Sequence, residues 1–249
     1  MVAAGLTDKG ITREQNQDAI LIASEPLGPL PNLFIVADGM GGHNAGDVAS
    51  KEAIAFIYNY VSNFQAAEFV QTDNYLDLLV SAVQDANTML CKMAQENTEM
   101  YGMGTTLTAC VVADSKLIFA HVGDSRAYAI TPDSITQVTA DHSYVEEMVQ
   151  AGQLTKEEAL THPKRHVITR VLGSKTSFEV DGIIMPIGDT TSVLLCSDGL
   201  TNMLDNNALK DIVNGLGFAA HRVKFLVEEA NARGGHDNIS TILIDLDKK

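Results

Sequence analysis

Residues 33–46 read LFIVADGMGGHNAG and decide the fold. The opening LFIVA is apolar and rich in aromatic and β-branched residues, which predicts a buried strand. Asp38 follows this strand and begins a segment with four glycines in nine positions. A hairpin turn needs only one or two special residues. The extra glycines therefore indicate backbone freedom that would let a carboxylate and a backbone carbonyl face the same ligand.

Three further aspartates lie at strand boundaries. Asp124 follows LIFAHVG, Asp198 follows VLLCS, and Asp237 leads into ISTILI. Asp and Gly are ordinary turn formers, so a single Asp-Gly after a strand is most often only a turn. Four such positions in one chain favour a shared site. Carboxylates gathered at one sheet edge would repel one another unless cations neutralise them.

The donor types favour hard cations. Carboxylate and carbonyl oxygens select Mg²⁺ or Mn²⁺. Zinc is disfavoured because the seven histidines and three cysteines form no HExxH or CxxC motif. His162 and His166 stand beside Pro163, Lys164 and Arg165, and we interpret them as loop histidines.

Composition excludes several other classes. The 249 residues carry 17 Lys+Arg and 32 Asp+Glu, a net charge of 17 − 32 = −15, and 45% are apolar. Such a chain can bury a core but repels nucleic acid and anionic lipid. No membrane-span or secretion pattern is found, and the sparse cysteines Cys91, Cys110 and Cys196 indicate reduced core thiols and a cytoplasmic protein.

The hydrophobic pattern predicts one domain, residues 1–249, in which antiparallel sheets are covered by helices. Helical spacing runs over residues 48–64 and 76–93, and shorter helices are expected at 143–150, 207–214 and 218–233. Predicted strands are residues 18–24, 33–37, 105–113, 117–122, 127–131, 178–184, 192–197 and 239–246.

Phosphoryl transfer suits this carboxylate pattern. Two hard cations sharing a carboxylate lower the pKa of a water and hold a phosphoryl group for in-line attack. The chain has no C-x5-R loop, no Gly-Lys pair of a P-loop and no G-x-S-x-G elbow. Arg13 lies just before Asp18 and could clamp a phosphate, although a lone surface arginine is equally common. Arg126, in GDSRA, is expected to pin its own loop by pairing with neighbouring carboxylates and not to meet substrate.

The motifs together resemble the metal-dependent serine/threonine phosphatases of type 2C, the PPM family, in their short bacterial form. The matching motifs are collinear: G-x-x-R-x-x-N-Q-D at 10–18, VADGMGGH at 36–43, GTT at 104–106, VGDSRAY at 122–128, ADHS at 140–143, TRVLG at 169–173, CSDGL at 196–200 and GGHDNIS at 234–240.

The resemblance implies an α+β fold, a four-layer α-β-β-α sandwich of two antiparallel sheets flanked by helices. It also implies two core Mn²⁺ or Mg²⁺ ions, and a third ion held by Asp124 with Asp198. Asp38 would bridge the core ions, and a water between them would attack phosphorus. The other implied roles are Asp198 and Asp237 at the first ion, Asp18 and the Gly39 carbonyl at the second, Arg13 on the substrate phosphate, and Asn238 orienting Asp237 or a bound water.

One position departs from the family pattern. Some members have His directly after the Asp-Gly of the second motif as a proposed general acid, and Met40 stands there in this chain. His43 is three residues further on and is interpreted as a loop-structuring residue. A water on the third ion is the preferred proton source.

The resemblance also implies a mobile flap at about residues 143–165. It implies phosphoprotein substrates carrying phosphoserine or phosphothreonine, and a serine/threonine kinase that the enzyme opposes. Two other functions stay open: a catalytically silent member that acts as a binding or regulatory module, and a metal-dependent phosphodiesterase or nuclease. Net charge disfavours the latter. Intact Asp38, Asp198, Asp237 and Arg13 disfavour the silent module.

Overall fold

Two antiparallel β-sheets pack face to face in the computed structural model, which describes residues 1–42, 45–64, 73–175 and 179–246. The first sheet has the strand order β1 (Val2–Asp8), β11 (Ile239–Asp245), β10 (Ser192–Cys196), β7 (Arg126–Ile130) and β8 (Ile135–Gln137). The second has the order β2 (Asp18–Ala23), β3 (Leu33–Met40), β5 (Leu107–Ala113), β6 (Lys116–Val122) and β9 (Asp181–Pro186), and β4 (Gly104–Thr105) pairs with β3.

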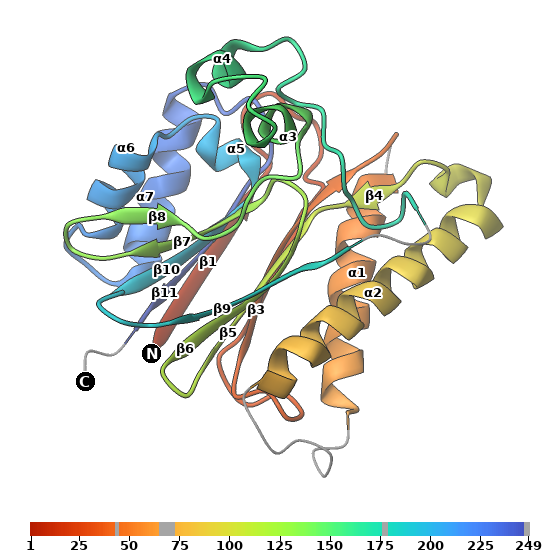
Figure 1. Cartoon of the computed structure of the whole chain (residues 1–249), viewed down its shortest axis with the longest axis horizontal. Helices are drawn as coiled ribbons and strands as arrows, with labels where there is room; N and C mark the ends of the chain where they lie inside the picture. Colours follow the sequence, from red (N-terminus) through yellow and green to blue (C-terminus); the bar gives the residue numbers. More distant parts are fainter. Residues whose placement is uncertain (43–44, 65–72, 176–178, 247–249) are drawn as a thin grey trace.

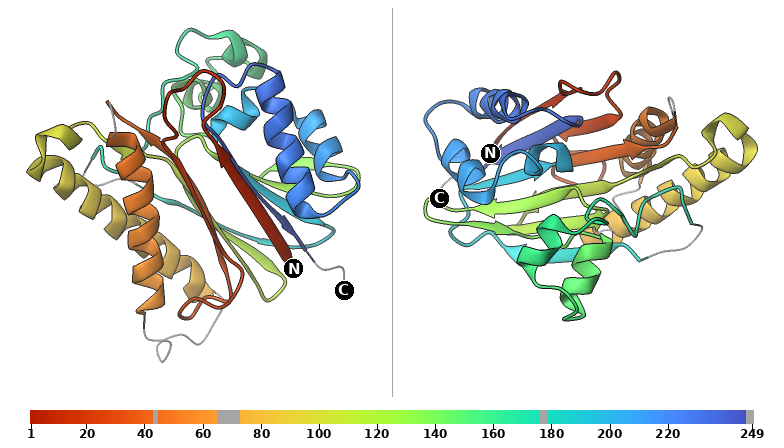
Figure 2. Two further views of the ribbon diagram at one scale, coloured as in Figure 1. Left: turned by 180° about the vertical axis from the view of Figure 1, so that it is seen from behind. Right: turned by 90° about the horizontal axis from the view of Figure 1, so that it is seen from above.

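Helices cover the outer face of each sheet, as Figures 1 and 2 show. The long helices α1 (Ala45–Ser62) and α2 (Asp73–Glu96) lie on the second sheet, and the short turn η2 (Thr98–Met100) follows α2. The first sheet carries α5 (Asp198–Thr201), α6 (Asn206–Val213) and α7 (Ala219–Ala232). The expected four-layer α-β-β-α sandwich is therefore confirmed.

Three apolar layers hold these elements together. One lies between α1, α2 and the second sheet, another lies between α6, α7 and the first sheet, and the third fills the space between the sheets. Phe34 and Phe119 of the second sheet meet Leu195 and Ile242 of the first in this central layer, and all four are fully buried. Each buried side chain of this size contributes about 1.5–3 kcal/mol relative to an exposed one.

A two-helix flap extends beyond the sandwich, formed by α3 (Tyr144–Gln150) and α4 (Lys156–Thr161) (Figure 1). The α3 helix was predicted, and Ser143 caps it by accepting a hydrogen bond from the Glu146 backbone. The two chain segments of the neck are tied by hydrogen bonds from Tyr144 N to Val167 O and from Thr169 N to His142 O, both 2.8 Å.

Several predicted boundaries were wrong. Strand β3 continues past Ala37, because Gly39 and Met40 pair with Thr105 and Gly104 of β4. The strand predicted at residues 178–184 forms instead at Asp181–Pro186, and residue 178 is outside the described ranges. Strands β1 and β8 and helices α4 and α5 were not predicted. No helix in the described ranges has the length and apolar character to cross a membrane.

Candidate metal centre

The pairing of β2 with β3 places Asp18 directly opposite Asp38. Asp18 is the first residue of β2 and is 3% exposed, whereas Asp38 lies near the end of β3 and is half-buried. The backbone N–H of Asp38 donates to Thr106 Oγ1 at 2.9 Å, which fixes the chain where β3 leaves the sheet. Two carboxylates separated by 20 residues in sequence are thus neighbours across one register position.

The first sheet contributes two more aspartates at the same end of the sandwich. Asp198 begins α5 two residues after the last residue of β10, and Asp237 lies two residues before the first residue of β11. The two segments lie side by side, since β10 pairs with β11 and a Cβ on Gly199 would lie 2.0 Å from the Asn238 carbonyl oxygen. Any side chain at position 199 would prevent this close approach, so glycine is required there.

Gly39 has the same role beside Asp38. A Cβ there would lie 2.0 Å from the Gly46 carbonyl oxygen at the start of α1. Gly39 has no positive φ, so it is needed for space and not for unusual backbone torsion. The backbone freedom predicted for this loop is used at Gly41, whose φ is +148°. His43 is outside the described residues.

These aspartates lie close enough together to raise one another's pKa values. Burial, followed by repulsion from Asp18, Asp198, Asp124 and Asp237, raises the pKa of Asp38 well above its usual range. Burial also raises the pKa of Asp18 to about 7 and that of Asp124 to about 7. The pKa of Asp198 is raised by burial and then by repulsion from Asp237. Concentrated negative charge of this kind is typical of a functional site.

The donor set fits a divalent cation. Asp18 Oδ1 and Asp124 Oδ1 are buried without a hydrogen-bond partner, which is costly unless a cation binds them. Carboxylate oxygens are the ligands of Mg²⁺ and related hard ions. Within the described ranges no group of three or more His, Cys, Asp or Glu side chains is placed as a ready-made metal site.

Arg13, from the loop between β1 and β2, reaches this cluster. Its Nη2 donates to Asp237 Oδ2 at 2.7 Å, and the Arg13 side chain remains 53% exposed. The hydrogen bond to Asp237 raises the pKa of Arg13. The guanidinium is accordingly at the solvent side of the aspartates, where it can meet an anionic ligand.

Asn238 ties the Arg13 loop to β11. Its Nδ2 donates to Lys9 O and Gln15 O, both at 2.9 Å, and its Oδ1 accepts from Gln17 N at 2.8 Å. Its backbone N–H donates to Asp237 Oδ1 at 2.8 Å. The side chain thus holds the loop, and the backbone contacts Asp237.

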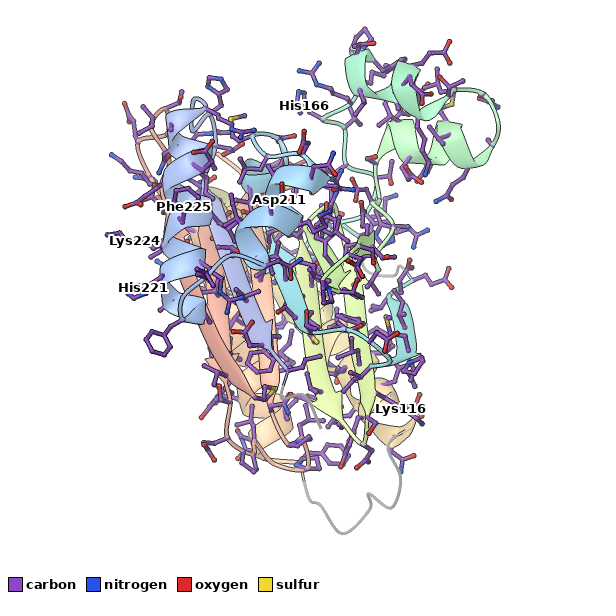
Figure 3. The ribbon with its side chains drawn as sticks, turned by 90° about the vertical axis from the view of Figure 1, so that its left-hand side faces the viewer. Lys116, His166, Asp211, His221, Lys224 and Phe225 are labelled. Carbon is purple, nitrogen blue, oxygen red and sulfur yellow. The ribbon has the colours of Figure 1, made fainter. Side chains whose placement is uncertain are left out.

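Asp124 occupies the turn between β6 and β7 and faces a cavity of about 730 Å³ under the flap. Asp198 and Lys156 of α4 line the same cavity. His166, near the flap neck and labelled in Figure 3, also lines it. Arg126 pairs with Asp141 through Nη2 and Oδ2 at 2.6 Å. The predicted pairing with a carboxylate is confirmed, but the partner lies beyond β8 and not in the loop of Arg126 itself.

Two contacts of the cluster were not predicted. Asn202 Nδ2 donates to Asp198 Oδ2 at 3.0 Å, and Ser197 Oγ donates to Asp18 Oδ2 at 2.8 Å. Asn202 was recognisable in principle, because residues four apart on a helix face one another. The Ser197 contact joins different sheets, and no local pattern indicates it.

Comparisons with known proteins agree with this geometry. The family model described as protein phosphatase 2C matches residues 11–243. A serine/threonine phosphatase stp of Listeria welshimeri is 36% identical over 243 residues, which cover 96% of this chain and 93% of the relative. A crystal structure of a bacterial serine phosphatase superposes with a TM-score of 0.92 at 35% identity, covering 100% of this chain and 99% of that chain.

A solved structure also carries metal. The catalytic domain of the serine threonine protein phosphatase PstP, in complex with two manganese ions, matches with a TM-score of 0.82 and 30% identity, covering 99% of this chain and 98% of that chain. The sandwich with an aspartate cluster at one end defines a phosphatase of the metal-dependent class. The chain belongs to the protein phosphatase 2C family.

Proposed function

We propose that this protein is a metal-dependent protein phosphatase that hydrolyses phosphoserine and phosphothreonine in proteins. The observation that carries the proposal is the register pair of Asp18 and Asp38 beside Asp198 and Asp237. Four acids from both sheets repel one another there, and the family to which the chain belongs includes serine/threonine phosphatases.

In this proposal, Asp38, Asp198 and Asp237 would hold one ion, and Asp38, Asp18 and the Gly39 carbonyl would hold the other. Bound divalent ions supply a water of lowered pKa and neutralise charge on the phosphoryl group. Asn202 holds the Asp198 carboxylate by a 3.0 Å hydrogen bond, which fixes its direction. Asn238 acts behind Asp237 through its backbone N–H.

We assign Arg13 to the substrate phosphate. Its guanidinium presents several donors in one plane, which matches two phosphoryl oxygens. Since Arg13 pairs with Asp237 in this structure, phosphate binding exchanges one anionic partner for another. The exchange is inexpensive because an exposed ion pair contributes only about 0–1 kcal/mol.

The core ions are proposed to be Mn²⁺ or Mg²⁺, and a third ion is assigned to Asp124 with Asp198. Support for this third position is the unpartnered Asp124 Oδ1, together with the cavity that both acids line. Repulsion from Asp198 is the second cause, after burial, of the raised Asp124 pKa.

We further propose one catalytic domain with a flap at residues 143–165, a serine/threonine kinase as the enzyme that it opposes, and action in the cytoplasm. The buried, unpaired state of Cys91, Cys110 and Cys196 suits a reducing compartment.

The deciding experiment compares a phosphothreonine peptide with an oligonucleotide as substrates, each with Mn²⁺ and with EDTA. We expect phosphate release from the peptide with Mn²⁺ only, and no release in the Asp38→Asn variant. A folded wild-type protein that binds phosphopeptide without turnover would instead identify a silent binding module. Preferred cleavage of the oligonucleotide would identify a nuclease.

A further inference from the structure

The side chain of Ser197 does not form the hydrogen bond that its position in the chain predicts. It is the N-cap residue of α5, where a serine hydroxyl ordinarily accepts a hydrogen bond from the first helical turn. No such bond is formed by its side chain. The hydroxyl is fully buried, and Oγ instead lies 2.8 Å from Asp18 Oδ2. The cap of α5 is thus given up for a contact with the other sheet.

The direction of this hydrogen bond is fixed. Ser240 N–H donates to Ser197 Oγ at 2.9 Å, and a backbone N–H has no other role than donor. The Ser197 hydrogen is therefore free for an acceptor. Asp18 Oδ2 is the nearer one, since the alternative, the Asn238 carbonyl oxygen, lies 3.5 Å away.

A second hydroxyl lies beside the same carboxylate. Burial raises the pKa of Asp18, and the neighbouring Ser240 side chain lowers it. Thr7 Oγ1 lies 2.7 Å from Ser240 Oγ and itself accepts from Asn16 Nδ2 at 2.8 Å. Hydrogen bonds thus link Asn16 through Thr7 to Ser240, whose backbone N–H donates to Ser197 Oγ.

Asn16 also contacts the backbone of Asp18. Asp18 N–H donates to Asn16 Oδ1 at 3.1 Å, so Asn16 holds the Asp18 backbone and begins the hydroxyl chain. Asp18 Oδ1 alone is left without a partner. The hydrogen bond from the Ser197 hydroxyl to this buried carboxylate favours its ionised form and limits its rotation.

We propose that Ser197, supported by Ser240 and Thr7, is a positioning residue that holds Asp18 with Oδ1 directed at the second metal site. The inference rests on the proposed function and extends it from the ligands to the groups behind them. Residues that orient a metal ligand in this way typically change metal affinity about 10- to 100-fold when removed.

Ser192 provides a matched control. It is the first residue of β10, whereas Ser197 follows the last; it is 5% exposed and donates from Oγ to Asp245 Oδ1 at 2.9 Å. Ser192→Ala therefore removes a hydroxyl–aspartate bond at the end of β10 remote from Asp198. Loss of such a bond without a role at the metal site would not weaken Mn²⁺ binding.

The experiment measures Mn²⁺ binding by calorimetry without substrate, thermal stability, and kcat and KM on a phosphothreonine peptide. We expect Ser197→Ala to weaken one Mn²⁺ site about 10- to 100-fold and to lower kcat at limiting Mn²⁺, with recovery at high Mn²⁺ and little change in KM. Ser192→Ala is expected to keep wild-type Mn²⁺ affinity.

Wild-type Mn²⁺ affinity in Ser197→Ala would overturn the assignment, as would an equal loss in Ser192→Ala. If Ser197→Ala does not fold, the isosteric Thr7→Val variant is measured in its place, because it removes the hydroxyl that contacts Ser240. Weakened Mn²⁺ binding would support the assignment, and unchanged binding would overturn it. A wild-type protein that binds no Mn²⁺ would overturn the proposed function and this inference with it.

Discussion

Arg13 Nη2 lies 2.7 Å from Asp237 Oδ2, so the residue assigned to the substrate phosphate is paired with a residue assigned to metal. The two are 224 positions apart in the chain and meet because β1 pairs with β11. With the proposed roles, a metal ion would bind the Asp237 carboxylate of this pair, and the substrate phosphate would bind the Arg13 guanidinium.

We predict that Arg13→Ala raises KM for a phosphothreonine peptide about 10- to 100-fold, because a hydrogen bond to a charged group contributes about 1.5–3 kcal/mol. Mn²⁺ binding without substrate should be no weaker than in wild type, since a competitor for Asp237 is removed. Steady-state kinetics and calorimetry test the two parts. Lys224→Ala is the control, because Lys224 lies on the outer face of α7 and pairs with Glu228 (Figure 3). An unchanged KM in Arg13→Ala would contradict the assignment.

The metal-free protein is predicted to lose stability as pH rises. Asp18 and Asp124 have pKa values of about 7, raised from 3.8, so between these values the folded state holds more protons than the unfolded state. The free energy of unfolding must then fall with rising pH across this window. Thermal melts in EDTA should give a lower Tm at pH 8 than at pH 5.5.

Mn²⁺ should remove this loss at pH 8, because a bound cation replaces the protons as counter-charge. Asp18→Asn is the control variant, and its Tm should depend less on pH in EDTA. A Tm in EDTA that is equal at the two pH values would show that the carboxylates do not repel one another as the structure indicates.

Asp124→Ala is predicted to separate two kinds of substrate. p-Nitrophenyl phosphate has a good leaving group that departs without a proton, whereas a serine or threonine oxygen needs one. If the ion assigned to Asp124 serves that departure, the variant keeps p-nitrophenyl phosphate turnover and loses phosphopeptide turnover. Parallel rate measurements decide, and an equal loss on both substrates would reject the role.

Gly199→Ala is predicted to destabilise the fold by about 1–3 kcal/mol, the usual range for overpacking. The added Cβ would meet the Asn238 carbonyl oxygen at 2.0 Å, and backbone must move to admit it. Gly42→Ala is the control, since a Cβ on Gly42 has no atom within 4 Å. Urea unfolding of both variants measures the difference. Equal stability of the two variants would mean that Gly199 and Asn238 are not packed this closely.

The long periodic elements were predictable from sequence because their apolar pattern is local. Helices α1 and α2 formed close to the predicted ranges. Helix α4 was missed although Thr155 and Glu158 form a capping box, a signal that can be recognised in the sequence. Strand β1, VAAGLTD, was missed because its small residues and Gly5 have weak strand propensity.

The strand-end aspartates were recognisable because Asp38, Asp124 and Asp198 each follow an apolar run. Their partners were not. The hydrogen bond from Ser197 to Asp18 spans 179 positions and depends on how the two sheets pack. The hydrophobic periodicity of the sequence does not indicate this packing. The pairing of Arg13 with Asp237 is equally non-local. Sequence therefore indicated the acids, and tertiary structure supplied the groups that orient them.

The placement of Asp237 two residues before β11 has a consequence for biosynthesis. During translation Asp237 is added 199 residues after Asp38 (237 − 38 = 199), so a shorter nascent chain lacks this carboxylate. β1 likewise gains its neighbour only after β11 has been synthesised. We therefore expect a ribosome-bound chain that stops before β11 to release no phosphate from a phosphopeptide.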